Sequence, residues 1–191
     1  WRNADAALQN LRSKGLLSLE SIAGLDEAEL AEIIKVSGFY NQKARRLSLL
    51  CKAIIADFGD FESFKSGVSR EWLLARKGIG AESCDAILCY ACERAVMVAD
   101  SYSARLLGAL GYEFESYDEL SAWLGELEFG RIYEFVNSAN FLCDAAAKAG
   151  KLENENGVYA LFHGLIVEFC KAHLRGKIFD DFAMEFFDNL K

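Results

Sequence analysis

Two features of this chain could do chemistry together: a glycine-rich turn, and a single carboxylate that follows it along the sequence. The turn is Gly78-Ile79-Gly80, and the carboxylate belongs to Asp100, which stands just before a helical pattern. Glycines allow a tight turn that a β-carbon would obstruct. The backbone N–H groups at the helix start near Ala81 favour an anion such as a phosphate. The spacing therefore indicates a protein that holds a nucleic-acid backbone and places an acidic side chain beside it.

Each feature also has an ordinary structural explanation. A glycine turn before a helix occurs in many proteins, and an aspartate before Ser101-Tyr102-Ser103 is typical of a helix N-cap. If Asp100 caps a helix that begins near Tyr102, the helix amides would keep its carboxylate ionised at neutral pH. Neither feature alone therefore decides the chemistry.

The distribution of charge is more informative than its sum. The 191 residues carry a formal net charge of −8, which argues weakly against a nucleic-acid partner. Acidic residues gather in 113–128 and 179–188, however, whereas basic residues gather in 43–52 and 65–77, near the turn. One face would then meet phosphates while another stays acidic and solvated. No apolar run reaches the roughly 18–20 residues of a membrane span, so we expect no membrane association.

The cysteines favour a reduced intracellular environment. All six lie inside helical patterns and no secretion signal is visible, so we expect reduced thiols in a cytosolic protein. Cys89 and Cys92 lie one turn apart in an apolar helix without a fourth ligand nearby, and we expect no metal there. The chain starts at Trp1 without an initiator Met, so we expect a processed or incomplete N-terminus.

The apolar pattern is helical almost throughout and shows no sustained strand, which predicts an all-α fold. Asp26 and Ser69 are expected N-caps. Apolar residues recur at helical spacing in residues 4–14, 26–36, 42–57, 82–93, 103–110, 117–125 and 157–174.

Four segments, in order along the chain, resemble one known family. The stretch Leu74-Ala75-Arg76-Lys77-Gly78-Ile79-Gly80 is similar to an L-P-G-V-G hairpin signature without the proline, and Val98-Ala99-Asp100-Ser101-Tyr102 stands where the family has V-D-T-H. Residues 38–44 look like the family's G-L-Y-N-x-K-A helix start, and Phe162-His163-Gly164 looks like its L-H-G. The chain thus resembles the helix-hairpin-helix DNA glycosylases of the endonuclease III superfamily, and within it the 3-methyladenine glycosylases most of all.

The resemblance implies an all-α, two-lobed fold with the active cleft between the lobes. One lobe would comprise residues 20–125, with the helix-hairpin-helix at about 70–92, and the other residues 1–19 plus 126–191. It also implies base excision repair: hydrolysis of the N-glycosidic bond of alkylated purines, above all 3-methyladenine, after base flipping, which leaves an abasic site. The partner would be double-stranded DNA with a damaged base, and the protein a monomer in the bacterial cytosol, associated with the nucleoid.

The resemblance assigns roles to individual residues. Asp100 would be the catalytic carboxylate, and Phe39 the wedge that fills the gap left by the flipped base, with Tyr40 as the alternative. His163 is expected to be a buried structural histidine. The expected DNA-binding residues are Lys77, Gly78, Ile79, Gly80, Ala81, Ser83 and Lys43.

Two departures from the family pattern refine the expectation. Glu82 stands where bifunctional members carry a Schiff-base lysine, and a carboxylate cannot form that imine, so we expect a monofunctional enzyme without lyase activity. Glu168 stands where many members have the first cysteine of an iron–sulfur cluster, and Cys170 is the only cysteine after Cys143, so we expect no cluster. The sequence leaves open whether hairpin carbonyls hold a monovalent cation.

Two other functions remain compatible with the sequence. One is a glycosylase of the same fold that removes another damaged or mismatched base. The other is a non-enzymatic helix-hairpin-helix module that only binds DNA.

Overall fold

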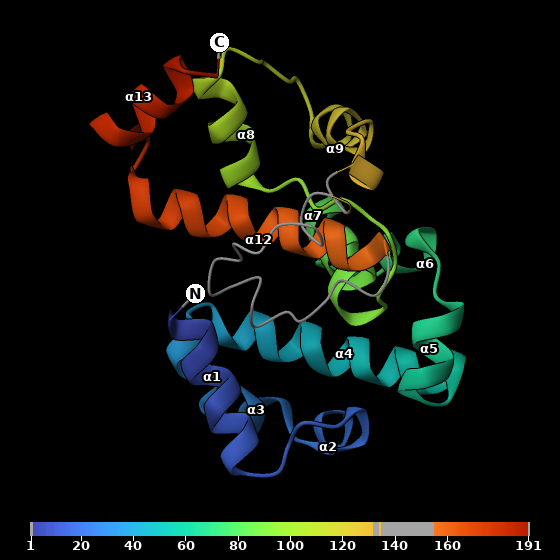
Figure 1. The fold of residues 1–191 in the computed structure, drawn as a ribbon. Helices are drawn as coiled ribbons and strands as arrows, with labels where there is room; N and C mark the ends of the chain where they lie inside the picture. The colour runs from blue at the N-terminus through green and yellow to red at the C-terminus, as the bar shows by residue number, and fades with distance from the viewer. Residues whose placement is uncertain (1, 132–133, 135–154, 191) are drawn as a thin grey trace. The chain divides into compact units, whose positions relative to one another are not determined.

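The computed structural model describes residues 2–131, 134 and 155–190, which form helices and one small β-hairpin (Figure 1). The chain divides into two compact units, Trp1–Ile79 and Gly80–Lys191, and each is described by itself. This division differs from the expected lobes of residues 20–125 and of 1–19 plus 126–191. The N-terminal helix groups with the first unit because its buried residues Ala7 and Leu11 belong to that unit's core cluster.

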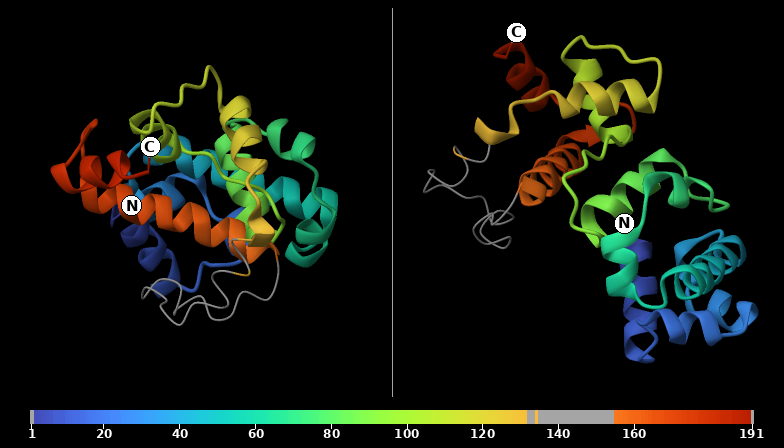
Figure 2. Two further views of the ribbon diagram at one scale, coloured as in Figure 1. Left: turned by 45° about the horizontal axis from the view of Figure 1, so that its top comes forward. Right: turned by 90° about the vertical axis from the view of Figure 1, so that its right-hand side faces the viewer.

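The first unit is organised around its longest helix, α4, against which α2 and α3 both pack (Figures 1 and 2). Leu30 of α3 and Ala44 of α4 are fully buried at the centre of the shared core. The helical elements of this unit are α1 (Arg2–Ser13), α2 (Leu19–Gly24), α3 (Glu27–Ile33), the 3₁₀ turn η1 (Lys35–Ser37), α4 (Tyr40–Phe58), α5 (Phe61–Gly67) and α6 (Arg70–Leu74).

A cluster of aromatic rings fixes the end of the first unit that leads into the glycine turn. Phe58, Phe64 and Trp72 pack edge to face, with ring centroids 5.1–5.9 Å apart. Such pairs stabilise by about 0.5–1.5 kcal/mol beyond their buried area. The Trp72 indole also donates a hydrogen bond of 2.8 Å to Asp57. Helix α6 is thereby held against α4 and α5 immediately before the turn.

The second unit has a separate core, in which Leu107, Leu124 and Phe187 come from three different helices. Its longest helix, α12, packs against α8. The elements of this unit are α7 (Ala81–Ala86), the π-helical turn η2 (Ile87–Ala91), α8 (Ser101–Ala109), α9 (Tyr117–Gly125), α12 (Glu155–His173), β1 (Leu174–Arg175), β2 (Ile178–Phe179) and α13 (Asp181–Asp188).

The all-α expectation is confirmed, with one addition. Each predicted helical period coincides with a helix, and Asp26 and Ser69 cap α3 and α6 as expected. The antiparallel pair of β1 and β2 was not expected, because strands of two residues are too short to show an alternating pattern. Helices α2, α5 and α13 were also not among the predicted helical periods.

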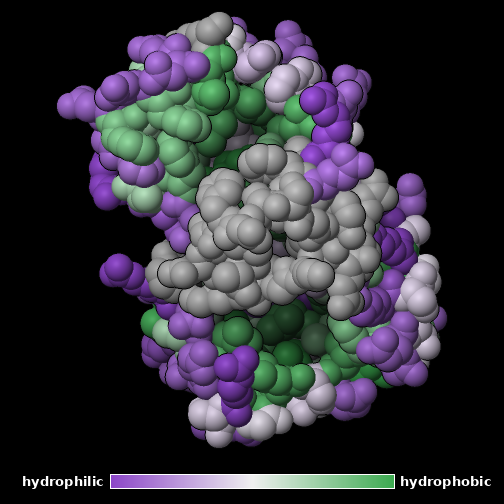
Figure 3. All heavy atoms as spheres, in the orientation of Figure 1, coloured by the Kyte–Doolittle hydropathy of each residue, from purple (hydrophilic) through white to green (hydrophobic). Residues whose placement is uncertain are grey.

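The surface of the second unit carries apolar side chains over α13 (Figure 3). Phe182, Phe186 and Leu190 are between 45% and 60% exposed. Among the described residues, no helix combines the length and the apolar character that a membrane span requires.

Candidate active site

The glycine turn is a tight β-turn at the end of the first unit. The Ile79 N–H donates to the Arg76 carbonyl at 3.1 Å, and Gly78 has a φ of 93°, which favours glycine. A β-carbon at Gly78 would also overlap with the side chain of Arg46. The requirement for glycine is therefore confirmed at this position.

At Gly80 the expected steric requirement is wrong. The backbone is extended there, with a φ of −92°, and a β-carbon would meet no protein atom within 4 Å. The difference from Gly78 arises because the turn is completed one residue earlier. Any need for glycine at position 80 must come from a ligand that approaches the backbone closely, not from the fold.

The turn presents polar groups to solvent. Lys77, Gly78 and Gly80 are exposed. Within the described residues, the backbone N–H groups of Gly78 and Gly80 have no protein acceptor. Gly80 is the N-cap of α7, whose first turn contains Ala81 and the exposed Glu82 and Ser83. These donors are available to an anion, as the sequence suggested.

Basic side chains of the first unit surround the turn. A groove is lined by Lys43, Arg46, Arg76 and Lys77 together with apolar residues of α1 and α4. The Lys43 ammonium donates to the Ser37 carbonyl at 2.6 Å. Arg76 stacks on the Trp72 ring, with its guanidinium carbon 4.4 Å from the centroid. Arg46 was not among the expected DNA-binding residues, although it lies in the basic stretch that the sequence analysis noted.

Phe39 is the most exposed large apolar side chain of the described chain, at 86%. It is the N-cap of α4 and has left-handed backbone angles, with a φ of 49°, which are uncommon for a bulky residue. Tyr40 instead packs against the core of the first unit. An exposed ring held in a strained conformation is compatible with the expected wedge, and only Phe39 meets that description.

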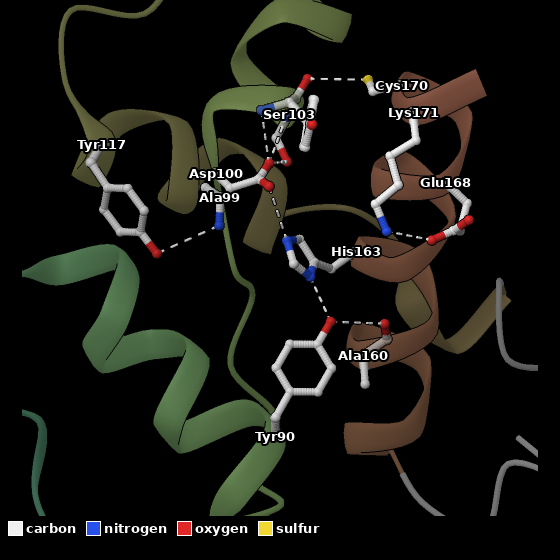
Figure 4. A network of polar contacts seen from close by, with 11 residues as sticks. Tyr90, Ala99, Asp100, Ser103, Tyr117, Ala160, His163, Glu168, Cys170 and Lys171 are labelled. Atoms are coloured by element: carbon white, nitrogen blue, oxygen red, sulfur yellow. Dashed lines mark hydrogen bonds and ion pairs between the residues drawn. The ribbon is translucent and has the colours of Figure 1, made fainter. Parts of the chain in front are cut away.

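Asp100 caps α8 with one carboxylate oxygen. Its Oδ1 accepts hydrogen bonds from the backbone N–H groups of Tyr102 and Ser103, both at 2.9 Å, and from the Ser103 hydroxyl at 3.2 Å (Figure 4). The side chain is 15% exposed. The expected N-cap is confirmed, and the cap leaves the second oxygen, Oδ2, free of these bonds.

The second oxygen faces His163 of α12. The distance between Asp100 Oδ2 and His163 Nε2 is 3.5 Å, and the imidazole is 12% exposed. On its other side, His163 Nδ1 lies 2.5 Å from the Tyr90 hydroxyl, which is also 3.3 Å from the Ala160 carbonyl oxygen (Figure 4). Three titratable groups from η2, α8 and α12 thus form one chain of polar contacts.

These contacts determine the charge of the carboxylate. Burial acts to raise the pKa of Asp100, but the His163 side chain and the hydrogen bonds from Ser103 outweigh it and hold that pKa below its ordinary value. Burial raises the pKa of Tyr90 to about 12, so its hydroxyl stays protonated. The site therefore holds an anionic carboxylate at neutral pH in a largely desolvated position.

A second contact chain positions the backbone next to Asp100. The Tyr117 hydroxyl donates to Asp85 of α7 at 2.9 Å and lies 3.5 Å from the Ala99 N–H. Asp85 is only 2% exposed. Tyr117 thereby links the helix that follows the glycine turn to the residue before Asp100.

Comparison with known proteins identifies the family. A model of the HhH-GPD superfamily of base excision DNA repair proteins matches residues 1–125. The chain belongs to this superfamily. A protein of Methanocaldococcus jannaschii, named provisionally as a DNA repair glycosylase, is 32% identical over 188 residues, which are 95% of this chain and 74% of the relative.

Two further proteins that are similar to this chain are also named as DNA glycosylases. The crystal structure of the H. pylori 3-methyladenine DNA glycosylase bound to 1,N6-ethenoadenine superimposes with a TM-score of 0.80 and 41% identity over 91% of this chain and 79% of that one. A thymine/uracil-DNA glycosylase of Methanothermobacter thermautotrophicus is 27% identical over 107 residues, 54% of this chain and 47% of the relative. The chain is therefore an HhH-GPD DNA glycosylase.

Sequence reasoning on this HhH-GPD protein missed most of the groups around Asp100. Tyr90, Asp85 and Tyr117 carried no signal of their own, because a tyrosine or an aspartate inside a helical period looks like any other helix residue. His163 was noted only as a structural histidine. Its position in Phe162-His163-Gly164, which resembles the family's L-H-G and follows Asp100 along the chain, was the one available signal.

The cysteines do not gather into a ligand set in the described part of the chain, where no group of three or more His, Cys, Asp or Glu side chains could hold a metal ion. Cys143 lies outside the described residues. Cys170 is fully buried and its pKa is raised by burial to about 11, which is typical of an unreactive core thiol. The absence of an iron–sulfur cluster stays a prediction.

Proposed function

We propose that this DNA glycosylase is monofunctional and hydrolyses the N-glycosidic bond of alkylated purines, 3-methyladenine foremost, in duplex DNA. The observation that carries the proposal is the Asp100 carboxylate, which is desolvated yet kept anionic by the α8 amides and His163. The substrate class is supported by the 41% identity to the H. pylori 3-methyladenine enzyme over most of this chain.

The chemistry follows from where charge develops. Loss of the base leaves an oxocarbenium-like sugar with a positive charge. A fixed anion in a low-dielectric position is already in place when that charge develops, and it stabilises the transition state. Asp100 has one oxygen committed to the helix cap and one directed away from it, which suits a fixed anion. The same carboxylate would orient the attacking water and accept its proton. An N3-alkylated purine is cationic and leaves without a strong general acid.

The absence of lyase activity rests on Glu82. It is exposed in the first turn of α7, where a carboxylate interacts favourably with the helix dipole and cannot form an imine with the sugar. The same proposal includes no iron–sulfur cluster: Glu168 stands in place of a cysteine ligand and forms an ion pair of 2.7 Å with Lys171. Double-stranded DNA would be held by the exposed turn and by Lys43, Arg46 and Lys77.

The test is a base-release assay on methylated duplex DNA, with released bases separated by chromatography and strand breaks scored before alkali treatment. We expect release of 3-methyladenine without nicking. Asp100→Asn should slow release by at least about 100-fold, because asparagine preserves the N-cap and removes only the charge. Asp26→Asn, a cap substitution on α3, is the matched control. Undiminished release by Asp100→Asn would overturn the catalytic assignment.

The thymine/uracil-DNA glycosylase relative supports a second candidate, excision of a mismatched or deaminated pyrimidine. Duplexes with a G·T or G·U pair, assayed beside the methylated duplex, separate the two. Faster release from the pyrimidine substrates would replace the alkylpurine proposal and leave Asp100 in its role. Strand nicking before alkali would contradict the monofunctional assignment.

A further inference from the structure

The groups around His163 and Asp100 determine which of these two residues donates a proton in the contact between them. His163 Nε2 is buried and, within the described residues, forms no hydrogen bond of standard geometry; the polar atom it faces is Asp100 Oδ2, at 3.5 Å. A buried ring nitrogen without a partner is costly, so the carboxylate is its natural acceptor. Catalytic hydrogen bonds in free enzymes are often long and shorten in the complex with substrate.

Only one neutral tautomer of His163 fits both neighbours. If Nδ1 carried the proton, the lone pair of Nε2 would point at an anionic carboxylate. If the Tyr90 hydroxyl donates to Nδ1, which lies 2.5 Å away, the proton is on Nε2 and points at Asp100. A doubly protonated ring also directs Nε2–H toward Asp100, with Tyr90 then accepting from Nδ1 and donating to Ala160.

The surroundings of Tyr90 fix its position. It lies on η2, and π-helical turns are frequent at functional sites. The Asn156 side chain donates to the carbonyls of Cys89 and Arg94 at 2.8 and 2.7 Å, which joins the start of α12 to the end of η2. Tyr90 and His163 are therefore held in register by a contact that is independent of both.

Titratable groups from two elements interact with Asp100: Tyr90 on η2, and His163 and Cys170 on α12. One step further away, Cys89 on η2 acts on Tyr90, and Arg105 on α8 acts on Cys170. Burial raises the pKa values of Cys89 and Cys170 to about 11, so both thiols stay neutral. Among these groups, His163 is then the one in direct polar contact with Asp100 Oδ2.

We propose, on the basis of the function assigned above, that Tyr90 and His163 are positioning residues for Asp100: the Tyr90 hydroxyl selects the Nε2–H tautomer of His163, which in turn orients Oδ2 toward the sugar and stabilises its negative charge. His163 does not contact the reacting atoms in this scheme. The role differs from that of a buried structural histidine, because it predicts effects on charge and rate rather than on folding alone.

The first experiment needs no substrate. The chain contains only two histidines, so the imidazole nitrogens of 15N-labelled protein can be assigned by comparison with His173→Gln. We expect neutral His163 to be in the Nε2–H form, and Tyr90→Phe to shift it toward a mixture of tautomers. The spectrum of His173 should not change. An Nδ1–H form of neutral His163 in the wild-type protein would overturn the proposal.

The second experiment measures single-turnover base release as a function of pH. We expect Tyr90→Phe to slow release about 3–10-fold, the equivalent of one hydrogen bond, and His163→Gln about 10–100-fold, as for other residues that orient a reactive group. In His163→Gln the acid limb of the profile should move to higher pH, because Asp100 loses a group that lowers its pKa. Binding of an abasic-site duplex should be unchanged in both.

His173→Gln and Tyr112→Phe are the controls, since each removes a group of the same type elsewhere in the second unit. Wild-type rates and pH profiles for Tyr90→Phe and His163→Gln, with Asp100→Asn inactive, would refute this proposal and leave the proposed function intact. A slower rate of His163→Gln with an unmoved acid limb would mean that His163 is only a structural support, and would also refute the proposal. Full activity of Asp100→Asn would refute the proposed function itself.

Discussion

Helix α12 carries two histidines, and each faces an aspartate that caps another helix. His163 faces Asp100, the cap of α8, and His173 faces Asp180, the cap of α13. The second pair is closer, at 3.0 Å against 3.5 Å, but its side chains are 27% and 44% exposed, compared with 12% and 15% in the first. The two pairs use the same chemical groups and differ in their access to water.

Because the two aspartates differ in exposure, similar histidine and N–H contacts have different consequences for their ionisation. At Asp180 the backbone N–H of Ala183 and the His173 side chain lower the pKa of a carboxylate that water would keep ionised anyway. At Asp100 burial opposes ionisation, and the contacts with His163 and Ser103 must overcome it. A desolvated anion interacts far more strongly with a developing positive charge than a hydrated one. Burial, not the residue pair, therefore distinguishes the candidate site.

The largest expected difference between the pairs is in catalysis. Asp100→Asn should slow base release from methylated duplex by at least about 100-fold, because the anion is lost. Asp180→Asn should leave release unchanged. Both substitutions preserve a good N-cap, so both variants should remain folded, and Asp100→Asn should lose only the part of the stability that depends on the charge. Equal loss of base release in Asp100→Asn and Asp180→Asn would show that burial of the carboxylate does not distinguish the catalytic aspartate.

As helix caps, by contrast, the two aspartates should behave alike. Asp100→Ala removes the acceptor of two backbone N–H groups and should lower the free energy of unfolding by about 1 kcal/mol. Asp180→Ala should also be destabilising, because it leaves the Ala183 N–H without its acceptor. Urea unfolding followed by circular dichroism measures both. A destabilisation confined to Asp180→Ala would mean that the Asp100 cap contributes nothing to stability.

The sequence predicted the parts of this site that depend on local chain geometry. Asp100 was expected to cap a helix because an aspartate stood just before a helical period, and Gly78 was expected to form a turn because glycine ended one helical period before another began. Both expectations rest on interactions between residues near each other in sequence. The structure confirms the cap and the turn.

What the sequence could not predict depends on contacts between distant residues. The Tyr90–His163 contact joins positions 73 residues apart, and the Tyr117–Asp85 contact joins positions 32 apart. Helical periodicity shows which face of a helix is apolar and does not show which polar side chains meet across the core. The exposure of Phe39 was also hidden, because its left-handed backbone turns it away from the core that receives Tyr40.

The pH dependence of stability should differ between wild type and Asp100→Asn. The folded-state pKa of Asp100 is lowered, so its contribution to stability is fully present above the unfolded pKa, about 3.9, and is lost as the pH falls through the folded-state value. The difference in free energy of unfolding between the two proteins should therefore decrease between pH 5 and pH 2. Urea titrations at several pH values test this. A difference that does not change with pH would mean that the pKa of Asp100 is not lowered by folding.

The smallest expected effect concerns the hydroxyl beside the carboxylate. Ser103 is fully buried and its Oγ donates to Asp100 Oδ1 at 3.2 Å, a contact with no counterpart at Asp180 in the described structure. Ser103→Ala keeps both backbone donors and should slow base release about 2–5-fold, since one neutral hydrogen bond to the anion is lost. Ser121→Ala, which removes a hydroxyl bonded to the Met97 carbonyl, is the matched control. A wild-type rate for Ser103→Ala would mean that the α8 amides and His163 alone determine the charge of Asp100.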